Sequence, residues 1–195
     1  MRNIITLFLL AVGFAATAQN TEVKAKGLHA FSTLGLSFVD NDYKPASGNS
    51  VQTTTGMEYS FSRSSSLGIA LSFDSYGYQK ETAAYDLDGS LKTTGLALFF
   101  RQKFTNGTWQ PYLKAGGGTA WVSLPTVSVE QAKTNIRKET QNVGMAMAEA
   151  GVQVHVLPRY SLLIAAEKKW LGKSTLADNK SLGTTGFKVG IISSF

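Results

Sequence analysis

The segment 182–195 constrains the fold of this chain more than any other stretch. From Phe187 onward, alternate positions are occupied by Phe187, Val189, Ile191, Ser193 and Phe195. The residues between them are mostly small or polar, and one of them, Lys188, is charged. A period of two is typical of a β-strand with one apolar and one polar face. The segment therefore predicts a strand with a different environment on each side.

The same alternation recurs through the rest of the sequence. We draw eight alternating segments, near 28–39, 51–62, 67–78, 93–104, 109–122, 143–155, 160–171 and 183–195. A tilted strand needs about 9–11 residues to cross a membrane, so each segment is long enough to do so. Beyond the first residues of the chain, the longest clear apolar runs are only 96–100 and 162–166, too short for a membrane helix. The pattern predicts an all-β fold.

The links between these segments alternate in length. Short links are expected at 63–66, 105–108 and 157–159, and longer polar loops at 40–50, 79–92, 125–142 and 172–181. Short turns at one end and longer loops at the other are typical of outer-membrane barrels. We therefore expect an eight-stranded antiparallel up-and-down transmembrane β-barrel that places four loops outside the cell.

The two faces of each segment indicate which way the barrel is turned. In 67–78, Leu67, Ile69 and Phe73 share one face, whereas Gly68 and Asp74 share the other. The other segments also collect their charges on one face and their large apolar residues on the opposite face. Charges in a dry core would cost more free energy than folding provides. The charged face is therefore predicted to line a polar lumen, and the apolar face to contact lipid.

Segment 143–155 fits this scheme less well, because two methionines share the parity of its carboxylate. We place Glu149, Gln153 and His155 inward. The inward charges from the different strands are then expected to form a network that closes the lumen. Its predicted members are Lys114, Glu149, Glu167, Lys188, Arg101, Asp74 and Glu58.

Aromatic residues cluster near the predicted strand ends, as expected for girdles at the two membrane interfaces. At the short-turn end we place Phe61, Phe104, Trp109, Tyr160 and Phe195, and at the loop end Phe38, Trp121 and Trp170. Ordinary core aromatics would not be expected to group at strand ends.

The start of the chain has the three parts of a secretory signal peptide. Arg2 is followed by an apolar run over 4–16 and by the small residues Ala16 and Ala18. The run is shorter than the roughly 20 residues that a transmembrane helix needs. We expect a signal peptide at 1–18, a periplasmic tail at 19–26 and the barrel at 27–195. The chain has no cysteine, so it forms no disulfide.

The net charge of +6 does not point to a nucleic acid partner. The predicted outer loops hold eight basic and eight acidic residues, so the basic side chains are not gathered on one face. A nucleic-acid site would need such a patch.

These features together resemble the small eight-stranded outer-membrane barrels of the OmpA transmembrane-domain and OmpX type, often labelled porin-like. The resemblance covers 27–195 and rests on architecture and on the closing strand 187–195. It implies insertion into outer-membrane lipid as a monomer. In that family the closing strand is an assembly signal, which here would comprise Phe187, Val189, Ile191 and Phe195 and would be recognised by the barrel-assembly machinery.

No motif for catalysis, metal binding or a cofactor emerges. His29 and His155 are both expected near the short-turn end, and no serine is adjacent to His155 in His155-Val156-Leu157. Asp86-Leu87-Asp88-Gly89 lacks the later ligands of a calcium loop and is better explained as a turn. Gly116-Gly117-Gly118 lacks the context of a phosphate loop and would make room for large neighbours.

Two function classes remain. In the first, the protein is a non-enzymatic anchor that displays its loops for envelope integrity, adhesion or surface interaction, with an unknown ligand. In the second, it is a small porin-like passive channel. A lumen of eight strands is just wide enough for side chains to fill, which favours the anchor. A lipid-modifying enzyme is a third, weaker alternative.

Overall fold

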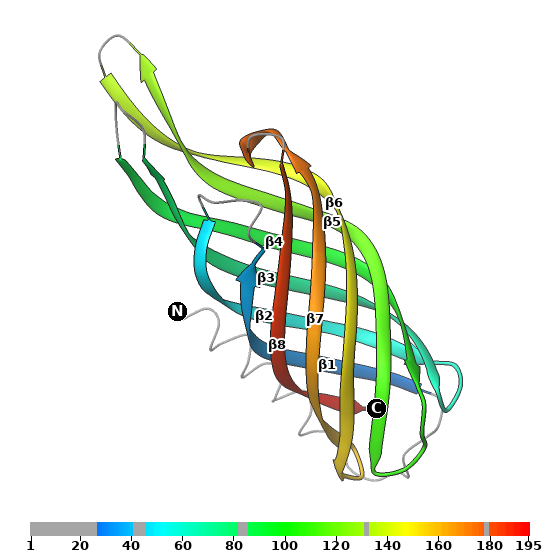
Figure 1. The fold of residues 1–195 in the computed structure, drawn as a ribbon. Coiled ribbons are helices and arrows are strands. Elements are labelled where there is room, and N and C mark those ends of the chain that lie inside the picture. Colours follow the sequence, from blue (N-terminus) through cyan, green and yellow to red (C-terminus); the bar gives the residue numbers. More distant parts are fainter. Residues whose placement is uncertain (1–26, 41–45, 82–85, 131–132, 178–179) are drawn as a thin grey trace.

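The computed structural model describes residues 27–40, 46–81, 86–130, 133–177 and 180–195, and it shows a closed antiparallel barrel (Figure 1). The predicted signal peptide 1–18 and tail 19–26 lie outside the described residues. Neighbouring strands pair in chain order, and the last pairs with the first, which confirms the predicted up-and-down barrel. The strands are β1 (Gly27–Val39), β2 (Ala46–Ser60), β3 (Ser65–Glu81), β4 (Asp86–Lys103), β5 (Trp109–Glu130), β6 (Lys133–Leu157), β7 (Tyr160–Ser174) and β8 (Lys180–Ser194).

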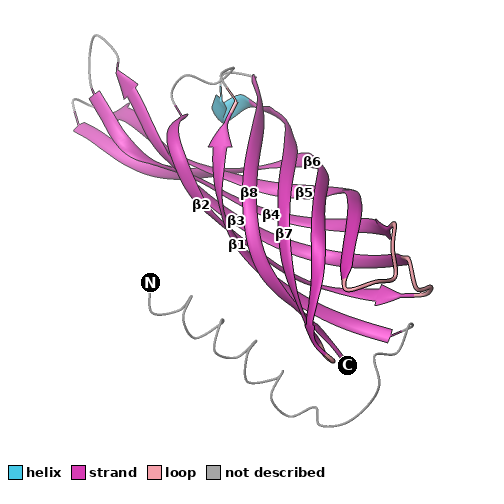
Figure 2. Cartoon of the chain, turned by 60° about the horizontal axis from the view of Figure 1, so that its bottom comes forward, coloured by secondary structure: helices cyan, strands magenta, loops and turns pink. Residues whose placement is uncertain are grey.

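Helix is nearly absent from this part of the chain. A single turn of 3-10 helix, η1 (Thr175–Ala177), follows β7 at the end of the barrel opposite the short links, which we call the outer end (Figure 2). Gln141 of β6 holds this turn, because its Oε1 atom accepts hydrogen bonds from the backbone nitrogens of Thr175 and Leu176. Among the described residues, no helix is long and apolar enough to cross a membrane.

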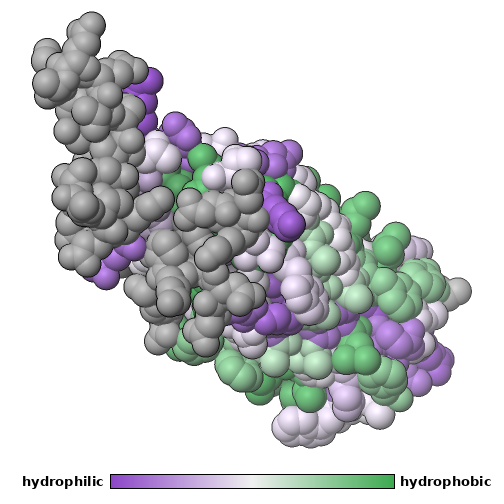
Figure 3. Space-filling model, turned by 45° about the horizontal axis from the view of Figure 1, so that its top comes forward, coloured by the Kyte–Doolittle hydropathy of each residue, from purple (hydrophilic) through white to green (hydrophobic). Residues whose placement is uncertain are grey.

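The closing strand has the predicted two faces. Phe187 is 63% exposed, whereas its neighbour Lys188 is only 3% exposed and lies inside the barrel. The apolar residues of the other strands also lie on the outer wall, and Figure 3 shows them spread over the visible wall in green. The predicted orientation, with large apolar side chains outward and charges inward, is confirmed. Glu149 and Gln153 of β6 are buried in the interior, as expected.

The three short links are confirmed, but two of the predicted long loops are wrong. β3 and β4 continue as a hairpin from Tyr76 paired with Leu91 to Glu81 paired with Asp86. β5 and β6 likewise continue to Glu130 paired with Lys133. These two outer hairpins extend past the rest of the barrel (Figure 1).

The polar composition of these segments suggested loops, but a hairpin ladder forms from backbone groups whatever the side chains are. Pro125 is tolerated within β5 because the pairing between β4 and β5 has ended at Lys92 and Ser123. Beyond that point, β5 has a free edge, where proline removes no ladder hydrogen bond.

The interior is not polar throughout, which corrects the prediction of a polar lumen. A hydrophobic cluster fills the outer part of the barrel and consists of Tyr76, Tyr78, Leu91, Ala97, Ala120, Val122, Leu124, Val143, Met145, Met147, Leu171 and Leu182. We call this set the outer plug. A second cluster, the inner plug, consists of Phe31, Ala70, Phe99, Tyr112, Leu163, Ala165 and Ile192. Inward positions in a narrow barrel touch one another across the lumen, so apolar residues there pack as a core.

Candidate functional site

Besides Lys103 at the end of β4, eight buried charges lie in the lumen, and they come from seven of the eight strands. We call them the lumen charge layer: Glu58, Asp74, Arg101, Lys114, Glu149, Glu167, Lys169 and Lys188. Four are acidic and four are basic, so the layer is electrically balanced. Each is at most 5% exposed. Buried charges are tolerated only when they are paired and hydrogen-bonded, so the contacts within the layer decide whether the barrel can hold it.

Lys188 joins two carboxylates at the centre of the layer. The strand register places Glu149 directly opposite Glu167, so two like charges face each other on adjacent strands. Lys188 Nζ lies 2.6 Å from Glu149 Oε2 and 2.5 Å from Glu167 Oε2. Lys114, which is opposite Glu149 in the ladder, forms a further ion pair with it. The two cations offset the repulsion between the carboxylates.

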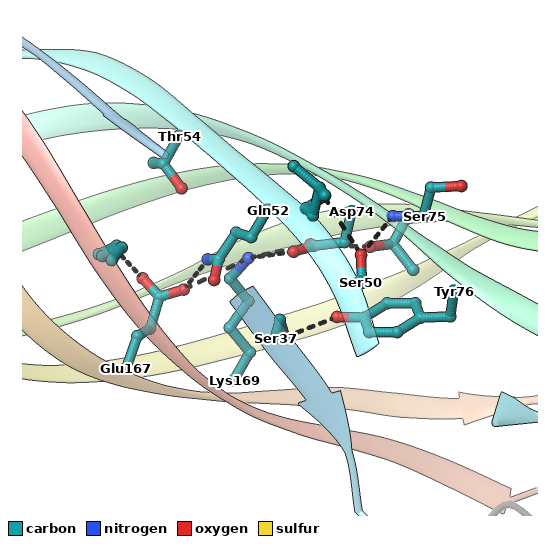
Figure 4. Close-up of polar contacts among 12 residues, drawn as sticks. Ser37, Ser50, Gln52, Thr54, Asp74, Ser75, Tyr76, Glu167 and Lys169 are labelled. Atoms are coloured by element: carbon teal, nitrogen blue, oxygen red, sulfur yellow. Dashed lines mark hydrogen bonds and ion pairs between the residues drawn. The ribbon is translucent and has the colours of Figure 1, made fainter. Parts of the chain in front are cut away.

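A chain of contacts runs from Glu167 across the lumen to β3 (Figure 4). Lys169 Nζ lies 3.3 Å from Glu167 Oε1 and 3.0 Å from Asp74 Oδ2. Gln52 of β2 donates a hydrogen bond to the same Glu167 oxygen. Thr93 of β4 donates to Asp74 Oδ2 over 3.0 Å. These contacts link β7, β2, β3 and β4 through side chains alone.

Arg101 and Glu58 form the other branch of the layer. Arg101 Nη1 lies 3.0 Å from Glu58 Oε2, and both side chains are fully buried. The guanidinium also lies over the Tyr112 ring, 4.7 Å from its centroid, in a cation–π contact. Tyr112 in turn donates a hydrogen bond of 2.6 Å to Glu149. The aromatic ring therefore connects this branch with the central carboxylates.

The structure brings all seven of the predicted lumen residues into this layer, in two branches that meet at Glu149. Lys169, Gln52 and Tyr112 were not predicted as members. Lys169 lies two residues after Glu167 and so shares its face, which was a usable signal. Nothing in the sequence pattern indicates that Gln52 or Tyr112 reaches across the lumen, because such contacts depend on the barrel's closure.

The predicted interface aromatics lie at the ends of strands with their rings outside the barrel. Phe61, Phe104, Trp109, Trp121 and Trp170 are exposed, and Tyr160 is half-buried. Tyr160 and Trp170 are ten residues apart on β7, which corresponds to about 25 Å along the barrel axis at a rise of about 3.3 Å and a tilt of about 40°. That height matches the apolar band of about 25 Å expected for an outer-membrane barrel.

Both histidines lie near the short turns, and each is paired with a serine. His29 Nδ1 is 2.8 Å from Ser194 Oγ, and His155 Nδ1 is 2.8 Å from Ser161 Oγ. The inference that His155 lacks a neighbouring serine is wrong, because the tight turn folds Ser161 of β7 back against it. A serine nucleophile also needs a third group that orients the histidine. Within the described residues, no carboxylate is hydrogen-bonded to either ring, and His29 Nε2 is buried without a partner.

Comparison with known proteins supports the fold. No family model matches the chain, and no curated protein matches it. Among solved structures, Neisserial surface protein A is 15% identical with a TM-score of 0.57, over 88% of this chain and 98% of that one. The outer membrane protein OprG from Pseudomonas aeruginosa is 12% identical with a TM-score of 0.53, over 87% and 97% of the two chains.

The attachment invasion locus protein Ail of Yersinia pestis is 18% identical with a TM-score of 0.50, over 86% of this chain and 99% of that one. Identities this low show the fold alone. The resemblance to small eight-stranded outer-membrane β-barrels is confirmed at that level, because all three are barrels matched over almost their whole length.

Proposed function

We propose that this protein is a non-enzymatic barrel of the outer membrane that anchors and displays its outer hairpins at the cell surface. The observation that carries the proposal is the filled interior. The outer plug, the lumen charge layer and the inner plug together fill the interior, and the inner plug packs directly against the charges through contacts such as Arg101 with Tyr112 and Lys114 with Phe99. The hairpins protrude beyond this filled part of the barrel (Figure 1). A barrel built in this way serves as a support for its outer end.

The outer hairpins supply a surface for interaction. The β5–β6 hairpin continues beyond Ser123, where pairing with β4 ends, and its exposed side chains include Arg137, Lys138 and Glu139. Loops and hairpins held by a rigid scaffold are common sites of binding. The hairpins would serve in adhesion, in contact with other surface molecules or in envelope integrity.

Export and assembly belong to the same proposal. The leader 1–18 would direct the chain across the inner membrane and then be removed. The outward row of β8 (Phe187, Val189, Ile191 and Phe195) would be read by the barrel-assembly machinery before β8 pairs with β1. The mature barrel would reside in outer-membrane lipid as a monomer, without a cofactor or nucleic acid partner.

A passive channel is the second candidate, and the packing argues against it. Ions would have to pass the outer plug, in which Leu91, Val122 and Leu124 are each at most 1% exposed. They would then meet the paired charges around Lys188. Water and ions enter an apolar constriction of this kind only at high cost. An enzyme is disfavoured because neither histidine–serine pair has the orienting group described above.

The absence of cysteine from the chain allows a direct test of the topology. Asn135→Cys places a thiol in the β5–β6 hairpin, and Gly107→Cys places one in a short turn. A membrane-impermeant maleimide should label the first variant on intact cells, and the second only after the outer membrane is opened. Labelling of Gly107→Cys alone on intact cells would invert the topology and defeat the proposal.

A further inference from the structure

The outer wall of the barrel has an apolar groove where β6, β7, β8 and β1 lie side by side. Its volume is about 470 Å³, within the range of about 300–1,000 Å³ common for small-ligand sites. Small residues form its floor, and larger apolar side chains flank it. The residues that shape it are Gly35, Leu36, Ala150, Ile164, Ala166 and Phe187.

A polar cluster lies immediately beside the groove on the same outer wall. Lys168 is two residues from Ala166 on β7, so the two side chains share a face and are neighbours along the strand. Lys168 Nζ lies 2.5 Å from Asp40 Oδ2 and donates a hydrogen bond of 3.1 Å to Thr185 Oγ1. Thr185 Oγ1 in turn donates a hydrogen bond of 3.3 Å to Asp40 Oδ1.

Backbone contacts fix the position of Asp40 in this cluster. The backbone nitrogen of Asp40 donates a hydrogen bond of 2.8 Å to the carbonyl oxygen of Gly183. Gly183 also makes room for the carboxylate, because a Cβ atom at that position would collide with Asp40 Oδ2. Lys168 keeps a side-chain exposure of 34% in this arrangement.

Lys168 lies near the end of the lipid-facing part of β7. Between Tyr160 and Trp170, it is the one charged residue on the outward row of β7, which otherwise reads Leu162, Ile164, Ala166 and Trp170. A lysine facing lipid is strongly destabilising at the middle of the membrane and nearly neutral near an interface. Lys168 adjoins the aromatic girdle at Trp170, so it lies at the level of lipid headgroups.

We propose that this part of the wall binds one anionic, phosphate-bearing lipid, with its headgroup at Lys168 and an acyl chain in the groove. The inference rests on the membrane location given under the proposed function. A lysine ammonium has three donor hydrogens, and Asp40 and Thr185 occupy two of them. The third is available to a phosphate oxygen. The groove begins at Ala166, two residues before Lys168 on β7. Its lining is almost purely apolar, as binding of a hydrocarbon chain requires.

A lipid fits this site better than a protein partner does. The groove has a volume of only about 470 Å³. A stable protein interface is a much broader surface, which buries about 1,200–2,000 Å² in total. A second copy of the chain would present the same cluster, in which the carboxylate of Asp40 is already paired with Lys168.

Native mass spectrometry of the purified, folded barrel tests the proposal. The barrel would be equilibrated in detergent with equal amounts of phosphatidylglycerol, which is anionic, and phosphatidylcholine, which is zwitterionic. We expect the wild-type protein to retain one phosphatidylglycerol with a preference of about fivefold or more over phosphatidylcholine, since the choline cation offsets the attraction of the phosphatidylcholine phosphate to Lys168 and phosphatidylglycerol has no such cation. Lys168→Gln should abolish the preference, and Asp40→Asn should increase it by removing the competing carboxylate.

Matched controls separate the headgroup from the groove. Lys173→Gln removes an exposed lysine of the same strand outside the cluster and should leave the preference unchanged. Ala166→Phe fills the groove and should reduce retention of both lipids, whereas Leu162→Phe, outside the groove, should not.

An unchanged preference in Lys168→Gln, or equal losses in Lys168→Gln and Lys173→Gln, would overturn the headgroup assignment. Unchanged retention in Ala166→Phe would overturn the groove assignment. Heat-modifiable migration of each variant in detergent gels shows whether it has folded. The cysteine-labelling result is independent, so a failure of lipid selectivity leaves the proposed surface-display function standing.

Discussion

Lys188 Nζ lies 2.5 Å from Glu167 Oε2 in the middle of the barrel, and both side chains are almost fully buried. Their strands, β8 and β7, are neighbours, but the partner of Lys188 in the ladder is Ala165, not Glu167. The lysine therefore leans along the strand toward the carboxylate pair formed by Glu167 and Glu149. Among the described residues, Lys188 is the one cation that contacts both carboxylates, whereas Lys114 contacts only Glu149 and Lys169 only Glu167 of this pair.

We predict that Lys188→Met lowers the free energy of unfolding by about 3 kcal/mol, because it removes the cation shared by two facing buried carboxylates and leaves Glu149 with Lys114 alone and Glu167 with Lys169 alone. Adding Glu167→Gln should recover part of the loss, since it removes one of the uncompensated charges. Urea unfolding of the lipid-reconstituted barrel measures both effects. Lys173→Met, at an exposed position of β7, is the control and should change stability by less than about 0.5 kcal/mol. Strictly additive losses in the double variant would show that the two residues are not coupled.

The glycines that face the inner plug give a second prediction. A Cβ atom on Gly116 would lie 2.8 Å from Phe99 Cβ and would also collide with the backbone carbonyl of Leu98. Gly116→Ala should therefore destabilise the barrel by about 1–3 kcal/mol, as overpacking does. At Gly144 no atom lies within 4 Å of the added Cβ, so Gly144→Ala should be nearly neutral. Equal effects of the two substitutions in the same unfolding assay would contradict the packing described here.

A third prediction concerns the barrel as a whole. Each of the eight strands pairs with both of its neighbours, and the β1–β8 pair closes the cylinder. A closed barrel lacks free edges along its wall and resists detergent at room temperature. Unboiled and boiled samples should therefore migrate differently in detergent gels. Identical migration together with a helical circular dichroism spectrum would exclude the barrel.

Most of the architecture could be predicted because strand periodicity reports which side of a wall each residue faces. Phe187 and Lys188 show this directly, since adjacent residues of one strand lie outside and inside the barrel. The lengths of β3 to β6 could not be predicted in the same way. Their outer hairpins lie beyond the lipid band, where both faces can be polar and the alternation fades, although the ladder continues through Glu81 and Glu130.

Contacts across the lumen were only partly predictable. Glu149 and Glu167 could be placed side by side because a tight turn sets the register of their strands. The pairing of Arg101 with Glu58 joins β4 to β2, which are not neighbours, so it follows from barrel diameter and side-chain length rather than from register. The outer plug was missed for a related reason. Tyr76, Val122 and Leu171 have the inward parity of the charged residues, and a lumen predicted to be polar from those charges includes no apolar core.

The central claim is that the lumen is closed, so that the barrel supports its outer hairpins and conducts nothing. Single-channel recording of the folded protein in planar lipid bilayers tests this most directly, with insertion verified by heat-modifiable migration of protein recovered from the same preparation. We expect no channel openings in the recorded current, because the outer plug and the ion pairs around Lys188 leave no continuous aqueous path. Stable openings of reproducible conductance would contradict it and would favour the passive channel.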